Sequence, residues 1–326
     1  MKSKKEKEEE KLKNLPLKVT KYIYNDIRHI DFKTDKEFKT TVELLLKNIS
    51  NTLIDWKQRE IGIKHIGGII LGNYGKKEIF YKYYNQQIYI TLSQQIADSR
   101  AALMKEACRI VTLSGKEIDS KIVETGIEKM LTKYVLFKLC GSSNKVIATT
   151  CSNCICLLVL YVQSQKIIER ICEQANSGGT ISKIRTAEAL MIIFKEYSEE
   201  LIYKNQQIIE ECLKILLGDT NDDVKVMARK AFLLYKMYYN EKAVTFMQTL
   251  VRTVQMKIKE DESKGVNLDI IYEEQESKTN KNTNESNEPL NIQSELKQQN
   301  TNENKEQKKK IIKPNNSLRK ITCHHL

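Results

Sequence analysis

Proline is almost absent from this chain of 326 residues, and this constrains the fold more than any other feature. The three prolines are Pro16, Pro289 and Pro314. The interval from residue 17 to 288 therefore lacks the residue that interrupts helices most strongly. We predict a mostly helical protein, and the pattern argues against a loop-rich β-sandwich.

The apolar residues of this interval recur at helical spacing. Ala187, Leu190, Met191 and Phe194 stand at positions i, i+3, i+4 and i+7, which places them on one face of a helix. The segment 145–163 is apolar on nearly all sides in its second half. We expect it to be the most buried helix.

Short polar breaks divide the helical region at a regular interval. They combine Gly past the end of one helix with Ser, Asn or Asp before the next, and they lie at 55–57, 97–100, 141–145, 177–180 and 218–222. The helices that follow are expected to start near 56, 100, 145, 183 and 224, in steps of 44, 45, 38 and 41 residues. Helix pairs of about 40–47 residues are typical of HEAT and armadillo repeats. We predict an all-α, armadillo-like α-solenoid of about six helix pairs, the last helix or pair lying at 240–260.

Stacking of the pairs places the turns within them on one long edge. The candidate binding residues at these turns are one aromatic, one amide and a line of cations: Trp56, Lys57, Arg100, Asn144, Lys145, Lys183 and Lys225. A cation near a helix N-terminus is mildly unfavourable, because it opposes the positive end of the helix dipole. The recurrence of cations at this position in successive pairs therefore indicates that they serve in binding. Solvated surface charge is the alternative interpretation of each cation. Trp56, the only tryptophan, is either an interface anchor or a local helix staple.

The net charge indicates an acidic partner. The chain carries +12, and because residues 1–15 contribute +2 and residues 261–326 contribute nothing net, residues 16–260 carry +10. A basic folded body fits nucleic acid, an anionic membrane surface or an acidic protein.

We expect three zones along the chain. Residues 1–33 form a charged lead, residues 34–260 form the repeat domain, and residues 261–326 form a disordered tail rich in Asn and Lys. The sequence contains no run of about 20 apolar residues, so we predict no membrane span. The start of the chain has no apolar signal core, and the cysteines lie in helical contexts, so we expect the cytoplasm.

Other motifs give weaker signals. Cys151, Cys154 and Cys156 lie in an apolar helix without a second ligand pair, so we expect core packing and no metal. The end Cys323-His324-His325-Leu326 follows a basic run but lacks the aliphatic residues of a prenylation box. His29 and His65 are the only histidines outside that end, and nucleotide-binding fingerprints are absent. We expect no enzymatic activity and no cofactor.

Four segments resemble TOG domains, in particular those of the CLASP (cytoplasmic linker-associated protein) family. They begin at Asp55-Trp56-Lys57, Asp98-Ser99-Arg100, Asn144-Lys145 and Asp222, in order and in register over about residues 36–250. The resemblance implies a flat paddle that binds tubulin along the turns within its helix pairs. It implies that Trp56 is the aromatic of the first turn and that Arg100, Lys145, Lys183 and Lys225 are the cations of the second to fifth turns. Ala101 stands where Ser is common, Lys225 stands where Arg is usual, and Arg229 is expected to pair with Asp219 or Asp222.

The function implied is regulation of microtubule dynamics through contact with tubulin or the microtubule lattice. Other microtubule-associated proteins are further partners that it implies, at the cytoskeleton of the cytoplasm, such as a spindle or cilium. Two other classes stay open from the residues alone. They are a nucleic-acid-binding α-solenoid and a helical-repeat scaffold that binds peptides along its concave face.

Overall fold

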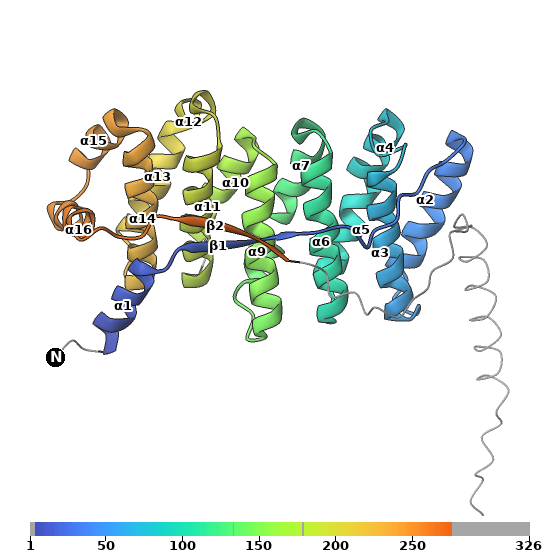
Figure 1. The fold of residues 1–326 in the computed structure, drawn as a ribbon, viewed down its shortest axis with the longest axis horizontal. Coiled ribbons are helices and arrows are strands. Elements are labelled where there is room, and N and C mark those ends of the chain that lie inside the picture. The colour runs from blue at the N-terminus through green and yellow to red at the C-terminus, as the bar shows by residue number, and fades with distance from the viewer. Residues whose placement is uncertain (1–3, 133, 178, 276–326) are drawn as a thin grey trace, which may run out of the picture.

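The computed structural model describes residues 4–132, 134–177 and 179–275. Its helices stand side by side in a long row two layers deep (Figure 1). What we call the inner layer consists of α3 (Trp56–Leu71), α6 (Ala101–Glu117), α9 (Lys145–Tyr161), α11 (Thr180–Glu196) and α14 (Asp222–Tyr238). Each of these helices contacts the next in the row.

Each helix of the outer layer contacts at least one helix of the inner layer. The outer layer consists of α2 (Asp35–Ser50), α5 (Tyr89–Ile96), α7 (Ser120–Met130), α10 (Gln165–Ser177) and α13 (Gln206–Leu217). Short elements complete the connections, namely α4 (Glu78–Tyr83), the π-helix η1 (Tyr84–Ile88), α8 (Leu136–Leu139) and α12 (Glu199–Lys204). With α15 (Asn240–Gln248) and α16 (Arg252–Ser263) at the far end, the predicted solenoid of about six pairs is confirmed.

Helix N-termini follow from the capping residues that the sequence places there. Asp55, Asn144 and Asn221 each accept hydrogen bonds from backbone amides of the first helical turn that follows. The inner helices begin at residues 56, 101, 145, 180 and 222, close to the predicted starts. Residues 154–159 of α9 are all buried, including Cys154, Leu157 and Leu158. The prediction that this is the most buried helix is wrong, because the first half of α9 is largely accessible: seven of its 17 residues are buried, against twelve of 17 in α6.

A two-stranded parallel ribbon crosses the inner layer, and it was not predicted from the sequence pattern. Strand β1 (Leu17–Tyr22) pairs with β2 (Ile270–Gln275), with Val19 opposite Tyr272. The ribbon runs across α14, α11 and α9 (Figure 1). Asn153 of α9 fixes β1 in place, because its amide accepts from the Thr20 N–H and donates to the Thr20 carbonyl, both at 2.8 Å.

The segment after β1 continues over the inner layer to the first pair. Ile27, Ile30 and Phe32 are buried there, and the Ile30 N–H donates to the Gly68 carbonyl at 3.0 Å. Gly68 permits this approach, since a Cβ at that position would lie 2.4 Å from the Arg28 carbonyl oxygen.

Helix α1 (Lys4–Asn14) closes the other end of the row. It packs against α14, where the buried Lys230 ammonium donates to the Leu15 carbonyl at 2.6 Å. Burial lowers the pKa of Lys230 to about 8. Arg229 binds Asp261 at 2.5 Å and Glu9 at 3.1 Å, which joins α1, α14 and α16.

Because of these contacts, the folded part of the chain extends beyond the boundaries expected at residues 33 and 260. Residues 7–33 are not only a charged lead, and residues 261–275 are not a disordered tail, because both contribute buried side chains to the solenoid. The local pattern concealed this, since a short strand needs a partner about 250 residues away to be stable. The basic segment 305–320 and the Cys323-His324-His325-Leu326 end lie outside the described residues.

Within the described ranges, no helix combines the length and apolar character that crossing a membrane requires.

Candidate functional site

The turns within the helix pairs lie along one edge of the row, at the N-terminal ends of the inner helices (Figure 1). We call this the turn edge. Polar side chains hold its first turn rigidly: Asn51 Oδ1 accepts from the Leu53 N–H at 3.0 Å, and Asp55 Oδ1 accepts from the Lys57 N–H at 2.9 Å. Such a fixed turn loses little conformational entropy when it meets a partner.

Ion pairs tie neighbouring turns to one another. The buried Arg59 guanidinium follows the first turn and donates to Asp98 Oδ2 of the second turn at 3.0 Å. Asp98 Oδ1 in turn accepts from the Arg100 N–H at 2.8 Å. These contacts hold the first two turns in register, as the predicted geometry requires.

Three of the predicted cations are available for a partner. Lys57, Arg100 and Lys145 are exposed. Within the described part of the chain, none of the three has a carboxylate partner, and only Lys57 makes a close contact, 5.8 Å from the centre of the Trp56 ring. They occupy the first, second and third turns.

The other two predicted cations already have carboxylate partners within the chain. Lys183 Nζ binds Asp219 Oδ2 at 2.6 Å, and the two side chains are 24% and 9% exposed. Burial acts to raise the pKa of Asp219, but hydrogen bonds from Lys183 and from the Asn221 amide outweigh it, so this pKa is lowered. Lys225 binds Asp222 Oδ1 at 2.7 Å. The fourth and fifth turns thus differ from the first three.

Trp56 and Asn144 have roles that can be stated from their contacts. Trp56 is half-buried and packs against the core, so the indole is neither fully exposed nor central. Asn144 is exposed and caps α9, accepting from the Val146 and Ile147 amides at 3.0 and 3.5 Å. Its side chain fixes the position of Lys145.

Sequence reasoning missed apolar side chains on the same edge. Leu53 is 80% exposed in the first turn, Val146 is 55% exposed beside Lys145, and Ile181 is 40% exposed at the start of α11. These apolar side chains add surface that a protein partner could bury on the same edge as the free cations. The available signal was an apolar residue next to three of the polar breaks, at 53, 146 and 181.

The expected pairing of Arg229 with a turn carboxylate is wrong. Arg229 contacts Asp261 and Glu9 instead, because its place in the second turn of α14 directs it toward α1 and α16 rather than toward the edge. Asp219 is taken by Lys183, and Asp222 by Lys225.

The cysteines behave as core residues. Cys151, Cys154 and Cys156 are buried free thiols in α9, and their pKa values are raised, with burial contributing in each case. The described residues contain no group of three side chains arranged to hold a metal ion. His65 is partly buried in α3, and burial lowers its pKa to about 4.

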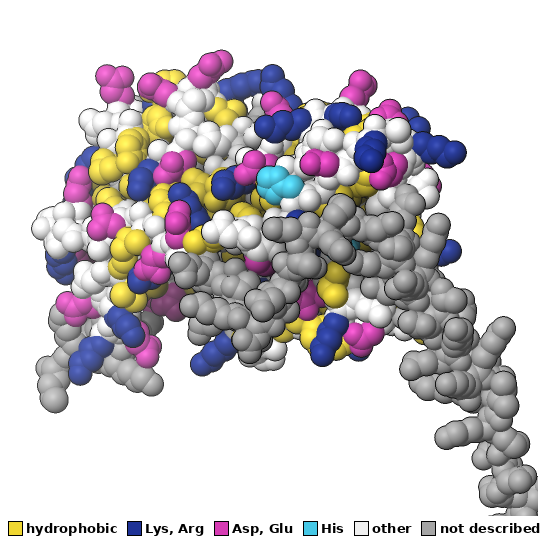
Figure 2. Space-filling view, turned by 45° about the vertical axis from the view of Figure 1, so that its right-hand side comes forward, with side chains coloured by type: hydrophobic (Ala, Val, Ile, Leu, Met, Phe, Trp, Pro, Cys, Tyr) yellow, Lys and Arg dark blue, Asp and Glu magenta, His cyan; other side chains and the backbone are white. Residues whose placement is uncertain are grey.

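Charge on the rest of the surface is mixed. Figure 2 shows cations and carboxylates interspersed over the side chains visible on that face. The side chains visible on that face therefore form no continuous basic field.

Comparison with known proteins identifies the family. The CLASP N-terminal model matches residues 35–259. CLIP-associated protein of Arabidopsis thaliana is 23% identical over 221 residues, which is 66% of this chain and 15% of the relative. CLIP-associating protein 1-A of Xenopus laevis is 20% identical over 235 residues, or 71% of this chain and 16% of the relative. The chain thus matches less than a fifth of the length of these relatives.

Solved structures agree on the fold. The TOG3 domain of Drosophila melanogaster Mini spindles has a TM-score of 0.52 at 12% identity, covering 69% of this chain and 94% of that one. The TOG domain of C. elegans Zyg9 has a TM-score of 0.51 at 13% identity, covering 80% and 95%. The chain belongs to the CLASP N-terminal family, and its solenoid has the fold of a TOG domain.

Proposed function

We propose that this chain binds tubulin through its turn edge and acts at the microtubule cytoskeleton of the cytoplasm by binding alone, without catalysis. The observation that carries the proposal is the group of free cations Lys57, Arg100 and Lys145, aligned on one rigid edge with the exposed Leu53 and Val146. Tubulin is an acidic protein, so this edge complements it in charge and offers apolar contacts. A protein of similar fold supports the choice of partner, because its solved structure is described as showing tubulin recruitment by microtubule polymerases with TOG domain arrays.

The seven predicted residues have different roles in this proposal. Lys57, Arg100 and Lys145 attract and contact tubulin, and Trp56 supplies an apolar surface that Lys57 partly covers. Asn144 positions the third turn. Lys183 and Lys225 contribute less to the attraction, because each is neutralised by a carboxylate at 2.6–2.7 Å.

The alternatives receive less support. The β1–β2 ribbon covers part of the inner layer, which is the surface that a peptide-binding scaffold would use. Nucleic acid binding favours a continuous basic surface, whereas Figure 2 shows interspersed charge on the face in view.

The test is size-exclusion chromatography and fluorescence anisotropy of the full chain with purified tubulin. Lys57→Glu and Lys145→Glu should each weaken binding, mainly through the association rate, and together should abolish co-elution. The affinity for tubulin should fall as the salt concentration is raised from about 50 to about 200 mM, because salt screens the attraction between exposed charges.

A matched control lies on the opposite edge. Lys121 follows Asp119 just as Lys57 follows Asp55, with the same N-cap hydrogen bond, 2.8 Å against 2.9 Å. Lys121→Glu changes the net charge equally and should leave tubulin binding within about twofold, a difference below about 0.4 kcal/mol. Equal loss in Lys57→Glu and Lys121→Glu would mean that net charge, and not the turn edge, governs binding. Undiminished binding by the folded double variant would refute the proposal.

A further inference from the structure

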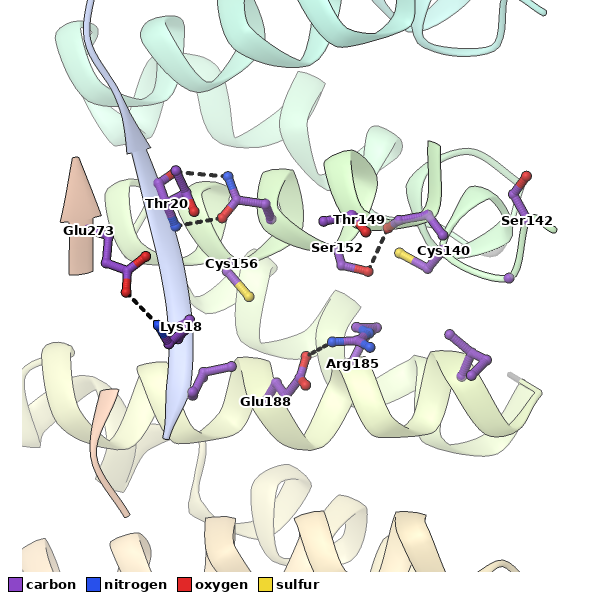
Figure 3. A pocket seen from close by; sticks show the side chains of 15 residues that line it. Lys18, Thr20, Cys140, Ser142, Thr149, Ser152, Cys156, Arg185, Glu188 and Glu273 are labelled. Carbon is purple, nitrogen blue, oxygen red and sulfur yellow. Dashed lines mark hydrogen bonds and ion pairs between the residues drawn. The ribbon is translucent and has the colours of Figure 1, made fainter. Parts of the chain in front are cut away.

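A cleft of about 630 Å³ lies on the inner-layer side of the molecule, between β1 and the N-terminal halves of α9 and α11 (Figure 3). One end is lined by Ser142 of the third turn and Ile181 at the start of α11, so it reaches the turn edge. The other end is lined by Lys18 and Thr20 of β1. The cleft therefore connects the edge proposed to meet tubulin with the inner layer.

Arg185 projects into the cleft between these ends (Figure 3). Its Nη1 donates to Glu188 Oε2 at 2.5 Å, and its side chain is 28% exposed. Its Nε is buried, and neither Nε nor Nη2 has a hydrogen-bond partner among the residues that the structure describes. A guanidinium carries five N–H donors, so most of the capacity of Arg185 is unused.

The other charges of the cleft are neutralised locally. Lys18 binds Glu273 at 2.7 Å at the β1 end, 60% and 49% exposed. Glu188 is buried beside Arg185, and its own pKa is raised by that burial. The cleft thus has little net charge, and it selects a ligand through directed donors. Nη2 is the unpartnered donor of Arg185 that a carboxylate can reach, because Nε is enclosed by the protein.

This arrangement changes the assignment at the fourth turn. Lys183, the predicted cation there, is occupied by Asp219. Arg185 lies two residues later on the same helix, with unused donors.

We propose that the cleft receives an acidic side chain of the tubulin dimer seated on the turn edge, and that Arg185 binds its carboxylate through Nη2. The inference rests on the proposed function and names the contact made at the fourth turn. Burial strengthens such a charge-assisted pair relative to one on an open surface, because water competes less for the donors.

The experiment measures tubulin affinity of the full chain by anisotropy for wild type, Arg185→Lys, Glu188→Gln and a control, Lys204→Gln. Lys204 is an exposed cation of α12, on the edge opposite the turns. Arg185→Lys keeps the charge but loses the planar fork, so Kd should rise about tenfold. Glu188→Gln removes the competing carboxylate, so Kd should fall about threefold. Lys204→Gln should leave Kd within about twofold.

The opposite signs separate a binding role from a structural one. If Arg185 and Glu188 only stabilised α11, both substitutions would break the same pair and would shift Kd in the same direction, with matching loss of thermal stability. An unchanged Kd in Arg185→Lys, or a shift of both variants in one direction, overturns the inference while tubulin binding by wild type stands. Absence of tubulin binding by the wild-type chain overturns the proposed function, and this inference with it.

Discussion

The ribbon is part of the cooperative fold, and Val19→Ala tests this directly. Val19 is fully buried in β1, opposite Tyr272 of β2 and above α9. The substitution removes two methyl groups, whose lost transfer free energy is about 1.6 kcal/mol. A residual cavity of about 25–50 Å³ adds about 0.6–1.2 kcal/mol. We therefore expect the free energy of unfolding to fall by about 2–3 kcal/mol.

The assay is urea denaturation of the full chain, followed by circular dichroism at the helical band and confirmed by thermal unfolding. A loss of this size corresponds to a fall in Tm of about 4–12 °C for a domain of this length. Because circular dichroism reports the helices and not the ribbon, a shift of the whole transition shows that the ribbon and the solenoid unfold together.

The neighbouring residue provides the control. The Lys18 side chain is 60% exposed, and its partner Glu273 is 49% exposed. Lys18→Ala should change the free energy of unfolding by less than about 1 kcal/mol, as for other exposed ion pairs. If Val19→Ala also leaves the helical transition within about 0.5 kcal/mol of wild type, the ribbon detaches independently, and the boundary expected at residue 33 is the better one.

Two further predictions concern single side chains. Lys183→Met should lower the free energy of unfolding by about 2 kcal/mol, between the values for exposed and buried pairs, since it leaves Asp219 unpaired. The Kd of Lys183→Met for tubulin should stay within about twofold of wild type. A loss of affinity equal to that of Lys145→Met would contradict the proposal that ion-paired cations contribute less to binding than free ones. His65 has a pKa of about 4 in the folded state and near 6.5 in the unfolded state. Between these two pH values the imidazole is protonated in the unfolded state but not in the folded state, so lowering the pH favours unfolding. Stability should therefore be lost between pH 6.5 and 4, by about 2–3 kcal/mol, in wild type but not in His65→Leu. Parallel pH profiles in chemical denaturation would show that this imidazole does not titrate as inferred.

The repeat architecture follows from local features of the sequence. Helix starts, caps and apolar stripes are local features, and capping at Asp55, Asn144 and Asn221 fixed where the inner helices begin. The interval near 40 residues then implied stacking, and stacking implied that the turns share an edge. The residues of that edge were identifiable for the same reason.

Which edge residues are free, and which segments belong to the fold, depends on contacts between distant parts of the chain. Lys145 and Lys183 look equivalent in sequence, yet one faces solvent and the other binds Asp219, a residue of the next helix pair. The pairing of Val19 with Tyr272 joins segments about 250 residues apart, and a local pattern carries no information about such a contact. Short-range physics sets helices and turns, whereas the packing of distant segments sets the burial and ion pairing on which binding depends.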